Sequence, residues 1–388
     1  MTDSKKIANI FDKFRGLSSV GIGNVVSSII GGGFWLFLAG LIGAEDYGQV
    51  SYIIAIAGLA CTVSGIGSGN TLIVFTAKKE NIQSSIILIT LVLSSISSII
   101  LFILFYDFGA SVYVIGIVIF SLVSSELLGR KYYTKYSVYL ITQRLSMAGL
   151  AILFYYIIGI DGIILGIGVS FLPYSYKLFK IFKKSEIDFK LLRSKKKFMI
   201  NSYILDLRGV FIGSVDKIII VPLLGFTLLG NYQLGIQIFT MLVILPSIVF
   251  QYTIPQDATG NVNSKLKLIT ILISILFTAI SIIFAPYILP TLFPEFTNAV
   301  QIVQIISLAV VPSTISTMYL SKFLGNENNK NMLIGTSIYL IIQISGIIIL
   351  GILYGIDGVA ISMVLAISSE AGYFIIIDKL KNKSNWYV

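Results

Sequence analysis

Long apolar runs, each close to the length needed to cross a lipid bilayer, dominate this chain of 388 residues. A membrane-spanning helix needs about 20 mostly apolar residues to cross about 30 Å of hydrocarbon. The mean hydropathy is +0.92 and only 12% of the residues are charged, which excludes an ordinary soluble domain. We predict an all-α integral membrane protein with twelve transmembrane helices, at residues 17–42, 50–74, 84–105, 110–128, 137–158, 163–181, 199–225, 229–253, 266–290, 299–321, 332–353 and 359–378.

The basic residues predict how these helices are oriented. Nearly all of the 28 Lys and Arg residues lie at the two ends of the chain or in alternate connections between predicted helices. Because basic residues gather in cytoplasmic loops, we expect both termini to be cytoplasmic and the protein to lie in the plasma membrane. The net charge of +10 is then explained by topology and by the anionic inner leaflet, so no nucleic-acid partner is expected.

Two short matches divide the chain into similar halves. Residues 41–48 (LIGAEDYG) and 223–230 (LLGFTLLG) share two glycines that are 182 positions apart, and the G-I-D-G sequence at 159–162 recurs at 355–358. Each match joins two successive predicted helices. We therefore predict two pseudo-symmetric six-helix lobes with parallel repeats, at residues 1–181 and 199–388, joined by a basic cytoplasmic linker at 182–198.

The predicted helix at 199–225 contains four charged residues: Asp206, Arg208, Asp216 and Lys217. Charges inside a membrane span are costly and normally face a partner or a wet cavity. At about 100° per residue, Asp206 and Lys217 share a face, and Arg208 and Asp216 lie on the other side. Two interpretations stay open. The charges neutralise one another as packing pairs, or the cations face a cavity that binds an anion.

Two more charged residues, Arg144 and Glu370, lie far from the ends of predicted helices. Arg144 is about 10 Å from the start of its helix at about 1.5 Å per residue, and the alternative to a cavity role is a side chain that reaches back to the interface. Glu370 follows Ser368 and Ser369 near the middle of the last helix. A carboxylate at that depth suits coupling to H⁺ or Na⁺, whereas the alternative is a static salt bridge to Lys217 or Arg208.

Several kinds of chemistry are excluded by composition. The chain has no His and a single Cys, Cys61, which excludes His-ligated metals and an internal disulfide framework. No G-x-x-x-x-G-K-[ST] sequence is present, so hydrolysis of ATP through a P-loop is not expected. We predict no catalytic residue, no metal and no cofactor, with a gradient of H⁺ or Na⁺ as the candidate energy source.

Several of these motifs resemble a known transporter family. The G-A-E-D-Y-G sequence at 43–48, D-K-I-I-I at 216–220, G-x4-G-N-Y at 225–232 and the two G-I-D-G hairpins are similar to those of the Wzx-type polysaccharide-export flippases. That family belongs to the multidrug/oligosaccharidyl-lipid/polysaccharide (MOP) superfamily. The resemblance covers essentially the whole chain, although its motifs are mostly structural. It implies a fold like that of MATE and MurJ proteins, with two six-helix bundles around a cavity that opens alternately to each side.

The resemblance also implies a function: flipping a polyprenyl-pyrophosphate-linked oligosaccharide across the membrane for polysaccharide or cell-surface glycan biosynthesis. Membrane lipid, glycan-assembly enzymes of the same pathway and a monomeric state would accompany that function. Chemistry favours the same substrate, because a pyrophosphate needs a cationic and polar path through hydrocarbon. The predicted substrate-binding residues are Arg208, Lys217, Arg144, Asp206 and Asp216, and the predicted ion-coupling residue is Glu370.

Two other classes of protein fit this sequence less well. A membrane glycosyltransferase or polymerase of the same pathway would need a sizeable outer loop with acids or bases, whereas the predicted outer connections have only a handful of residues. A MATE-type drug or cation antiporter would favour carboxylates in its cavity, so the cations of the helix at 199–225 count against it.

Overall fold

The structure is a computed structural model that describes residues 2–258, 263–325 and 329–384. Within these ranges, the side chains of residues 2–19, 205, 208, 211, 212, 251, 254–256, 258, 324, 325, 329 and 381–384 are not described. The described residues form α-helices and one 3-10 helix, with no strand among them, which confirms the predicted all-α class.

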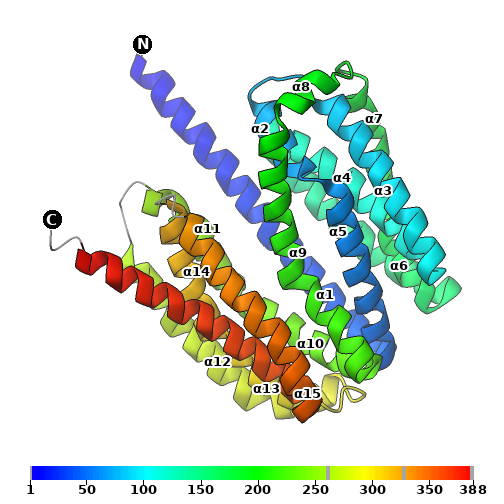
Figure 1. Ribbon diagram of the computed structural model, residues 1–388, viewed down its shortest axis with the longest axis vertical. Coiled ribbons are helices and arrows are strands. Elements are labelled where there is room, and N and C mark those ends of the chain that lie inside the picture. The colour runs from blue at the N-terminus through cyan, green and yellow to red at the C-terminus, as the bar shows by residue number, and fades with distance from the viewer. Residues whose placement is uncertain (1, 259–262, 326–328, 385–388) are drawn as a thin grey trace. The chain divides into compact units, whose positions relative to one another are not determined.

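The chain forms two compact units (Figure 1). The first comprises Met1–Phe34 and Ile53–Ser214, and the second comprises Trp35–Tyr52 and Val215–Val388. Helices α1 (Thr2–Gly65) and α9 (Lys196–Leu224) contribute to both units. The first unit also contains α2 (Ser68–Ala77), α3 (Gln83–Phe105), α4 (Phe108–Gly129), α5 (Tyr133–Ile158), α6 (Ile160–Val169), η1 (Leu172–Tyr174), α7 (Ser175–Phe182) and α8 (Phe189–Ser194). The second contains α10 (Phe226–Leu242), α11 (Ile244–Ala258), α12 (Ser264–Leu292), α13 (Ala299–Ser307), α14 (Val310–Gly325) and α15 (Asn329–Ser384).

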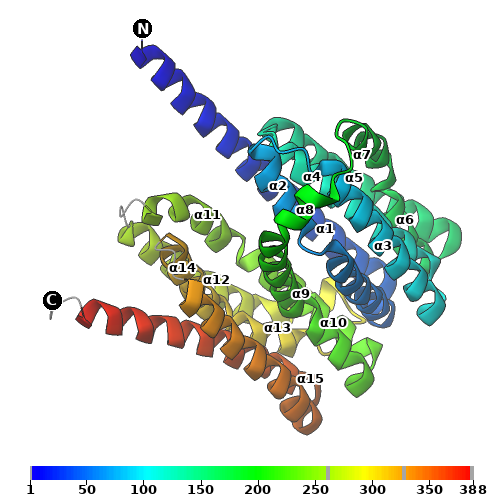
Figure 2. The same cartoon turned by 45° about the horizontal axis from the view of Figure 1, so that its top comes forward.

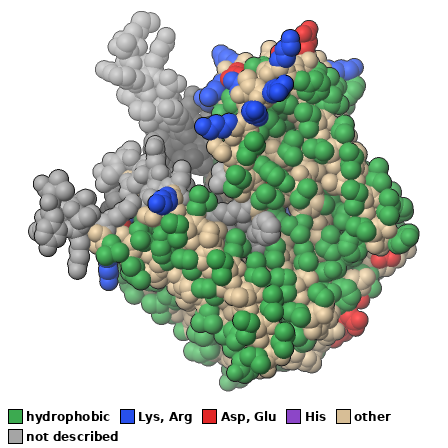
Figure 3. Space-filling view, in the orientation of Figure 1, with side chains coloured by type: hydrophobic (Ala, Val, Ile, Leu, Met, Phe, Trp, Pro, Cys, Tyr) green, Lys and Arg blue, Asp and Glu red, His purple; other side chains and the backbone are tan. Residues whose placement is uncertain are grey.

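Each unit is a bundle of neighbouring helices with an apolar core of its own. In the first unit α4 packs against α2, α3 and α6, and α5 packs against α6. In the second unit α12, α13, α14 and α15 lie side by side (Figure 2). Lys and Arg side chains gather over the end of the first unit that carries α7 and α8, and hydrophobic side chains cover the helices beyond it (Figure 3). A surface this apolar is expected where helices face lipid.

The helices of all four predicted hairpins meet at single glycines. Gly43 (φ 77°, ψ 178°) and Gly225 (φ 86°, ψ 176°) have nearly the same backbone conformation, and so do Gly159 (φ 85°, ψ −150°) and Gly355 (φ 61°, ψ −141°). This region of φ and ψ is accessible essentially to glycine alone. The matched glycines of the two halves therefore share geometry as well as sequence. The connection between the predicted helices at 199–225 and 229–253 is shorter than expected, because α10 already begins at Phe226.

A second pair of matched glycines brings two of these hairpins into contact within the second unit. A Cβ atom on Gly48 would collide with the carbonyl oxygen of Phe226, and one on Gly230 would collide with that of Ala44. Ala44 and Phe226 are also 182 positions apart. The contact is therefore reciprocal, as expected for two copies of one hairpin that face each other. Tyr47, beside this contact, is fully buried, and its ring packs edge-on against Trp35 and Phe296.

The structure places fewer clear membrane spans than the twelve predicted. Eight helices of the described chain are long and apolar enough to cross a membrane, or nine if α10 and the start of α11, bent by 45°, form one span. Two of the eight, Val20–Gly65 and Lys330–Leu380, contain the breaks at Gly43 and Gly355. The chain is a multi-pass membrane protein by these helices. A count of twelve spans requires that each of the two long helices crosses the membrane twice and that α9 also crosses it. The count of twelve and the two six-helix bundles stay predictions.

The division into units differs from the predicted lobes of 1–181 and 199–388. Residues 35–52 group with the second unit because they make the reciprocal glycine contact with α10. The start of α9 groups with the first unit, where Gly67 approaches the backbone of Met199 and Tyr203 so closely that a Cβ would not fit.

The predicted linker at 182–198 is packed against the first unit. The hydroxyl of Ser84 lies 2.6 Å from the carbonyl oxygen of Phe182 and 2.7 Å from that of Ser185. Leu192, in α8, is buried in the same apolar core as α2, α3 and α4. Lys195 forms an ion pair of 2.7 Å with Glu80. The stretch is basic, as predicted, but much of it is docked on this bundle.

Candidate functional site

A polar cavity of about 490 Å³ lies inside the first unit, where α1, α2, α3, α4 and α9 meet. It adjoins the break between α1 and α2, where Gly67 has a positive φ of 72°. Hydroxyl, amide and carboxyl groups from all five helices face one space in an otherwise apolar bundle. The polar side chains that line the cavity include Thr62, Asn70, Thr90, Ser121, Ser125 and Asp206, and Cys61 lines it as well.

Asp206 is the one predicted site residue that lines this cavity. Its side chain is partly buried, and its Oδ1 accepts a hydrogen bond of 3.3 Å from the amide of Asn70. Across the cavity lining, the hydroxyl of Thr90 is buried and has no hydrogen-bond partner among the described residues. A buried hydroxyl without a partner costs about 1–3 kcal/mol, so this group favours a ligand or a water molecule in the cavity.

Arg144, in α5, is a partly buried cation in the same unit. Its Nη1 lies 3.6 Å from the sulfur of Met147, and its charge interacts with Tyr113 and Tyr136. Among the described side chains no carboxylate lies within 4.0 Å of it. The guanidinium therefore has no counter-charge within ion-pair distance among the described side chains, and its planar set of donors suits a phosphate.

Arg208 belongs to α9, but its side chain lies outside the described residues. The backbone places it two positions after Asp206 in the same helix. Its predicted role in binding the substrate therefore stays a prediction.

Asp216 and Lys217 form a buried ion pair in the second unit. The Nζ of Lys217 lies 3.3 Å from Oδ1 of Asp216, and the backbone N–H of Lys217 donates to the same oxygen at 2.8 Å. The pair lies beside Tyr232, which also interacts with Asp216 and with Gln343. The sequence left open whether these charges pair with one another or face a cavity, and in the structure Asp216 and Lys217 pair. The two partners are adjacent in the chain. Substrate binding by these two residues stays a prediction.

Glu370 is held by hydroxyl groups of α14 and of the part of α15 that precedes the break at Gly355. Its Oε2 accepts a hydrogen bond of 2.9 Å from Ser316 in α14, and its Oε1 accepts one of 3.4 Å from Thr336 in α15. The sequence had pointed to its neighbours Ser368 and Ser369 as the polar surroundings. Both Glu370 and Asp216 are within electrostatic range of the buried Tyr339 in the second unit.

Sequence reasoning missed a buried ion pair between α11 and α12. The Nζ of Lys267 lies 2.5 Å from Oδ2 of Asp257, and the hydroxyl of Ser321 in α14 donates to the same oxygen at 2.5 Å. Thr253 extends the network through a 2.9 Å hydrogen bond with Ser321. Asp257 had been placed in a loop, whereas α11 continues to Ala258. The sequence signal for this ion pair was an acid, Asp257, and a base, Lys267, on either side of a short polar segment between two apolar runs.

Glu126 and Arg130 are four positions apart near the end of α4, a spacing that is typical of an ion pair on the surface of a helix. The ion pair is present, but Glu126 is only 2% exposed, and its Oε2 is buried without a partner among the described residues. Glu126 is buried because α4 packs closely against α2 near this end, where Gly129 leaves no room for a Cβ beside Thr76.

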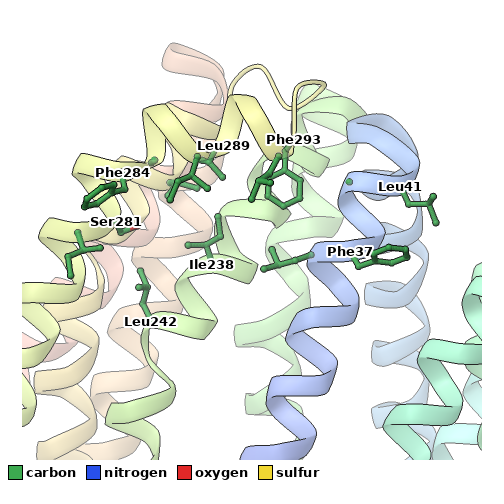
Figure 4. A pocket seen from close by; sticks show the side chains of 15 residues that line it. Phe37, Leu41, Ile238, Leu242, Ser281, Phe284, Leu289 and Phe293 are labelled. Carbon is green, nitrogen blue, oxygen red and sulfur yellow. The ribbon is translucent and has the colours of Figure 1, made fainter.

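An apolar groove of about 660 Å³ lies in the second unit, between α1, α10, α12 and α13. Figure 4 shows Phe37 and Leu41 of α1 on one side and Phe284 and Leu289 of α12 on the other, with Phe293 between them. Its lining is almost entirely hydrocarbon, with Ser281 as the one polar side chain among the lining residues, so the groove suits an apolar group.

No protein-family model and no curated protein matches the chain. Solved structures do match. An inward-facing multidrug-resistance MATE transporter of the MOP superfamily aligns with a TM-score of 0.72 and 15% identity, over 93% of this chain and 95% of its own. The lipid II flippase MurJ, in an inward closed conformation, aligns with a TM-score of 0.71 and 16% identity, over 93% and 87%. A MOP-superfamily transporter from Pyrococcus furiosus has a TM-score of 0.60 and 15% identity, over 94% and 95%. The chain therefore has the fold of the MOP-superfamily transporters.

Proposed function

We propose that this protein is a transporter that flips a polyprenyl-pyrophosphate-linked oligosaccharide across the membrane by alternating access. The fold likeness to both a multidrug transporter and a lipid II flippase, each over 93% of the chain, supports transport as the general activity. The pathway would be the biosynthesis of a polysaccharide or a cell-surface glycan. Glycan-assembly enzymes of that pathway would supply the substrate on the cytoplasmic side.

The observation that carries the choice of substrate is Arg144. A guanidinium in the interior of a membrane protein is costly unless something balances its charge. The described groups that interact with Arg144 include the sulfur of Met147 and two tyrosines, and no described carboxylate forms an ion pair with it. A pyrophosphate would supply the missing negative charge and accept two parallel hydrogen bonds from the planar guanidinium. Arg208 would add a second cation in the same unit.

Coupling to a gradient of H⁺ or Na⁺ is assigned to Glu370. Its two oxygens already accept hydrogen bonds from Ser316 and Thr336, which come from different helices. A carboxylate with hydroxyl neighbours can bind a proton, or it can provide the oxygen ligands that a hard cation prefers. The remaining parts of the proposal are a monomer in the plasma membrane, with both termini in the cytoplasm.

A MATE-type drug or cation antiporter is the second candidate, and the cavity around Asp206 favours it. Among the described residues that line this cavity, Asp206 is the only one with a charge. A cavity with one carboxylate and several hydroxyls would attract a cationic substrate.

Transport by the purified full chain in proteoliposomes tests the proposal. A fluorescent polyprenyl-pyrophosphate-linked sugar in the inner leaflet should become accessible to an impermeant reductant faster than in empty vesicles, whereas ethidium should not be transported. Arg144→Ala should abolish this flipping. Arg193→Ala is the matched control, because Arg193 is an exposed arginine of α8 in the same unit. Ethidium transport without lipid flipping would favour the antiporter and contradict the proposal.

A further inference from the structure

The polar cavity of the first unit has the chemistry of a binding site for uncharged hydroxyl groups. Its lining combines donors and acceptors on five helices, with the amide of Asn70 and the carboxylate of Asp206 beside hydroxyls such as Ser121 and Ser125. A hydroxyl both donates and accepts hydrogen bonds, so such a lining complements a ligand that carries many hydroxyls itself.

Charge separates this cavity from the part of the unit that suits a phosphate. Asp206 is the only charged residue in the described lining. A pyrophosphate there would face a carboxylate in a low dielectric and be repelled. The cation with neutral neighbours, Arg144, does not line the cavity. The anionic pyrophosphate and the uncharged, hydroxyl-bearing part of one head group would therefore bind at separate places in this unit.

Arg144 and the cavity share a neighbour in Tyr113. Tyr113 is within electrostatic range of both Arg144 and Cys61, and Cys61 lines the cavity. These three residues come from α5, α4 and α1, all in the first unit. A pyrophosphate held at Arg144 would therefore have a polar cavity for its sugar within the same bundle.

Size and the hydroxyl of Thr90 argue for a sugar over a single ion. The volume of about 490 Å³ is within the range of about 300–1,000 Å³ typical of small-molecule sites and far above the roughly 30 Å³ of one water molecule. The Thr90 hydroxyl is buried, lines the cavity and has no partner among the described residues. A hydroxyl of the ligand would provide the missing hydrogen-bond partner of Thr90.

We infer that this cavity binds the pyranose sugar next to the pyrophosphate of the substrate, through hydrogen bonds to Thr90, Asn70 and Asp206. The inference rests on the proposed function and adds to it the place and the chemistry of sugar recognition. It also specifies the predicted substrate-binding role of Asp206, as an acceptor for sugar hydroxyls.

Binding of two short-chain probes to the full chain in nanodiscs tests this inference. Nanodiscs are needed because common detergents carry sugar head groups of their own. One probe is a farnesyl pyrophosphate bearing glucose, galactose, N-acetylglucosamine or N-acetylgalactosamine, and the other is its methyl ester, which has the same charge and no sugar. At least one sugar probe should bind about tenfold or more tightly than the methyl ester, because each hydrogen bond to a buried polar group contributes at this level.

Variants of the cavity should remove this difference. Thr90→Val keeps the shape and loses the hydroxyl, and Asp206→Asn loses the charge, so both should bring the sugar probe close to the methyl ester. Ser94→Ala is the matched control, because Ser94 is buried in the same helix, donates to the carbonyl of Leu91 and does not line the cavity. Its sugar preference should be unchanged.

The single cysteine locates the bound sugar without any substitution. Cys61 is the only cysteine of the chain and lines the cavity, so the favoured sugar probe should slow its reaction with a maleimide more than the methyl ester does. Equal binding of all probes and the methyl ester would overturn the inference. Protection of Cys61 by Na⁺ alone would overturn it too and would indicate a cation site. Flipping that proceeds without sugar preference refutes only this inference, whereas tight sugar binding without flipping refutes the proposed function.

Discussion

Removing the ammonium of Lys267 should destabilise the second unit, because it leaves the carboxylate of Asp257 buried without a counter-charge. The side chains of Lys267 and Asp257 are only 12% and 1% exposed, and their charged atoms are 2.5 Å apart. Losing one partner of a buried ion pair costs about 3–5 kcal/mol. Lys267→Met is the suitable change, since Met keeps a long, flexible, apolar side chain.

The expected loss lies at the low end of that range. The hydroxyl of Ser321 still donates to Oδ2 of Asp257 in the variant, and a hydrogen bond to a charged group is worth about 1.5–3 kcal/mol. The other oxygen, Oδ1, is already buried and has no partner among the described residues. We therefore expect Lys267→Met to lower the free energy of unfolding by about 3 kcal/mol. The double variant Asp257→Leu, Lys267→Met should lose less, because it leaves neither charge unpaired.

The free energy of unfolding can be measured by titrating the purified protein in mixed micelles with SDS and following helix content by circular dichroism. Lys265→Met is the matched control. Lys265 is an exposed lysine at the start of the same helix, and no ion pair to it is present among the described side chains. Its substitution should change the free energy of unfolding by less than about 0.5 kcal/mol. The reasoning is refuted if both single variants lose the same stability, or if the double variant is less stable than Lys267→Met.

Three further predictions concern the hairpins, the topology and the driving force. Gly230→Ala should cost about 1–3 kcal/mol of unfolding free energy through the clash with the other hairpin, whereas Gly149→Ala, with no atom within 4 Å of the new methyl group, should be neutral or stabilising in the same SDS titration. In a background without the native cysteine, Asp161→Cys should react with an impermeant thiol reagent added outside cells and Lys190→Cys should not; the reverse pattern would contradict the predicted orientation. Glu370→Gln should still bind a lipid-linked sugar but lose the dependence of flipping on an imposed pH or Na⁺ gradient, and unchanged gradient dependence would remove this residue from the mechanism.

The hairpins could be predicted from sequence because their chemistry leaves little choice. Chains that reverse direction at one residue need a backbone conformation that only glycine adopts readily, and the paired glycines at 43 and 225 mark two such places. The apolar runs likewise leave helices as the only structure that satisfies its own backbone hydrogen bonds in lipid. Both inferences depend on local physics, so they needed no knowledge of tertiary packing.

The partners of the charged residues could not be predicted in the same way. The rotation of about 100° per residue placed Asp216 and Lys217 on different sides of the helix. A lysine side chain is long and flexible enough to reach a neighbour in the chain, and here it does so at 3.3 Å. For Glu370, the hydroxyls come from Ser316 and Thr336, which are far away in sequence. Such contacts follow from how helices pack, which the sequence pattern does not encode directly.

The two halves of the chain agree in their hairpins and differ in their charges, and this contrast argues for where function lies. At the offset of 182 positions, the counterparts of Asp216 and Lys217 are Phe34 and Trp35, and the counterpart of Asp206 is Asn24. The glycines that shape the hairpins are kept in both copies, as their nearly equal dihedral angles require. Packing therefore explains the residues that the halves share. It does not explain why ionisable groups precede the hairpin at Gly225 and not the one at Gly43, since the helix before Gly43 has uncharged residues at the matching positions and forms the same hairpin. A polar or charged cargo, and an ion that drives it, would give those residues a purpose that the fold itself does not require.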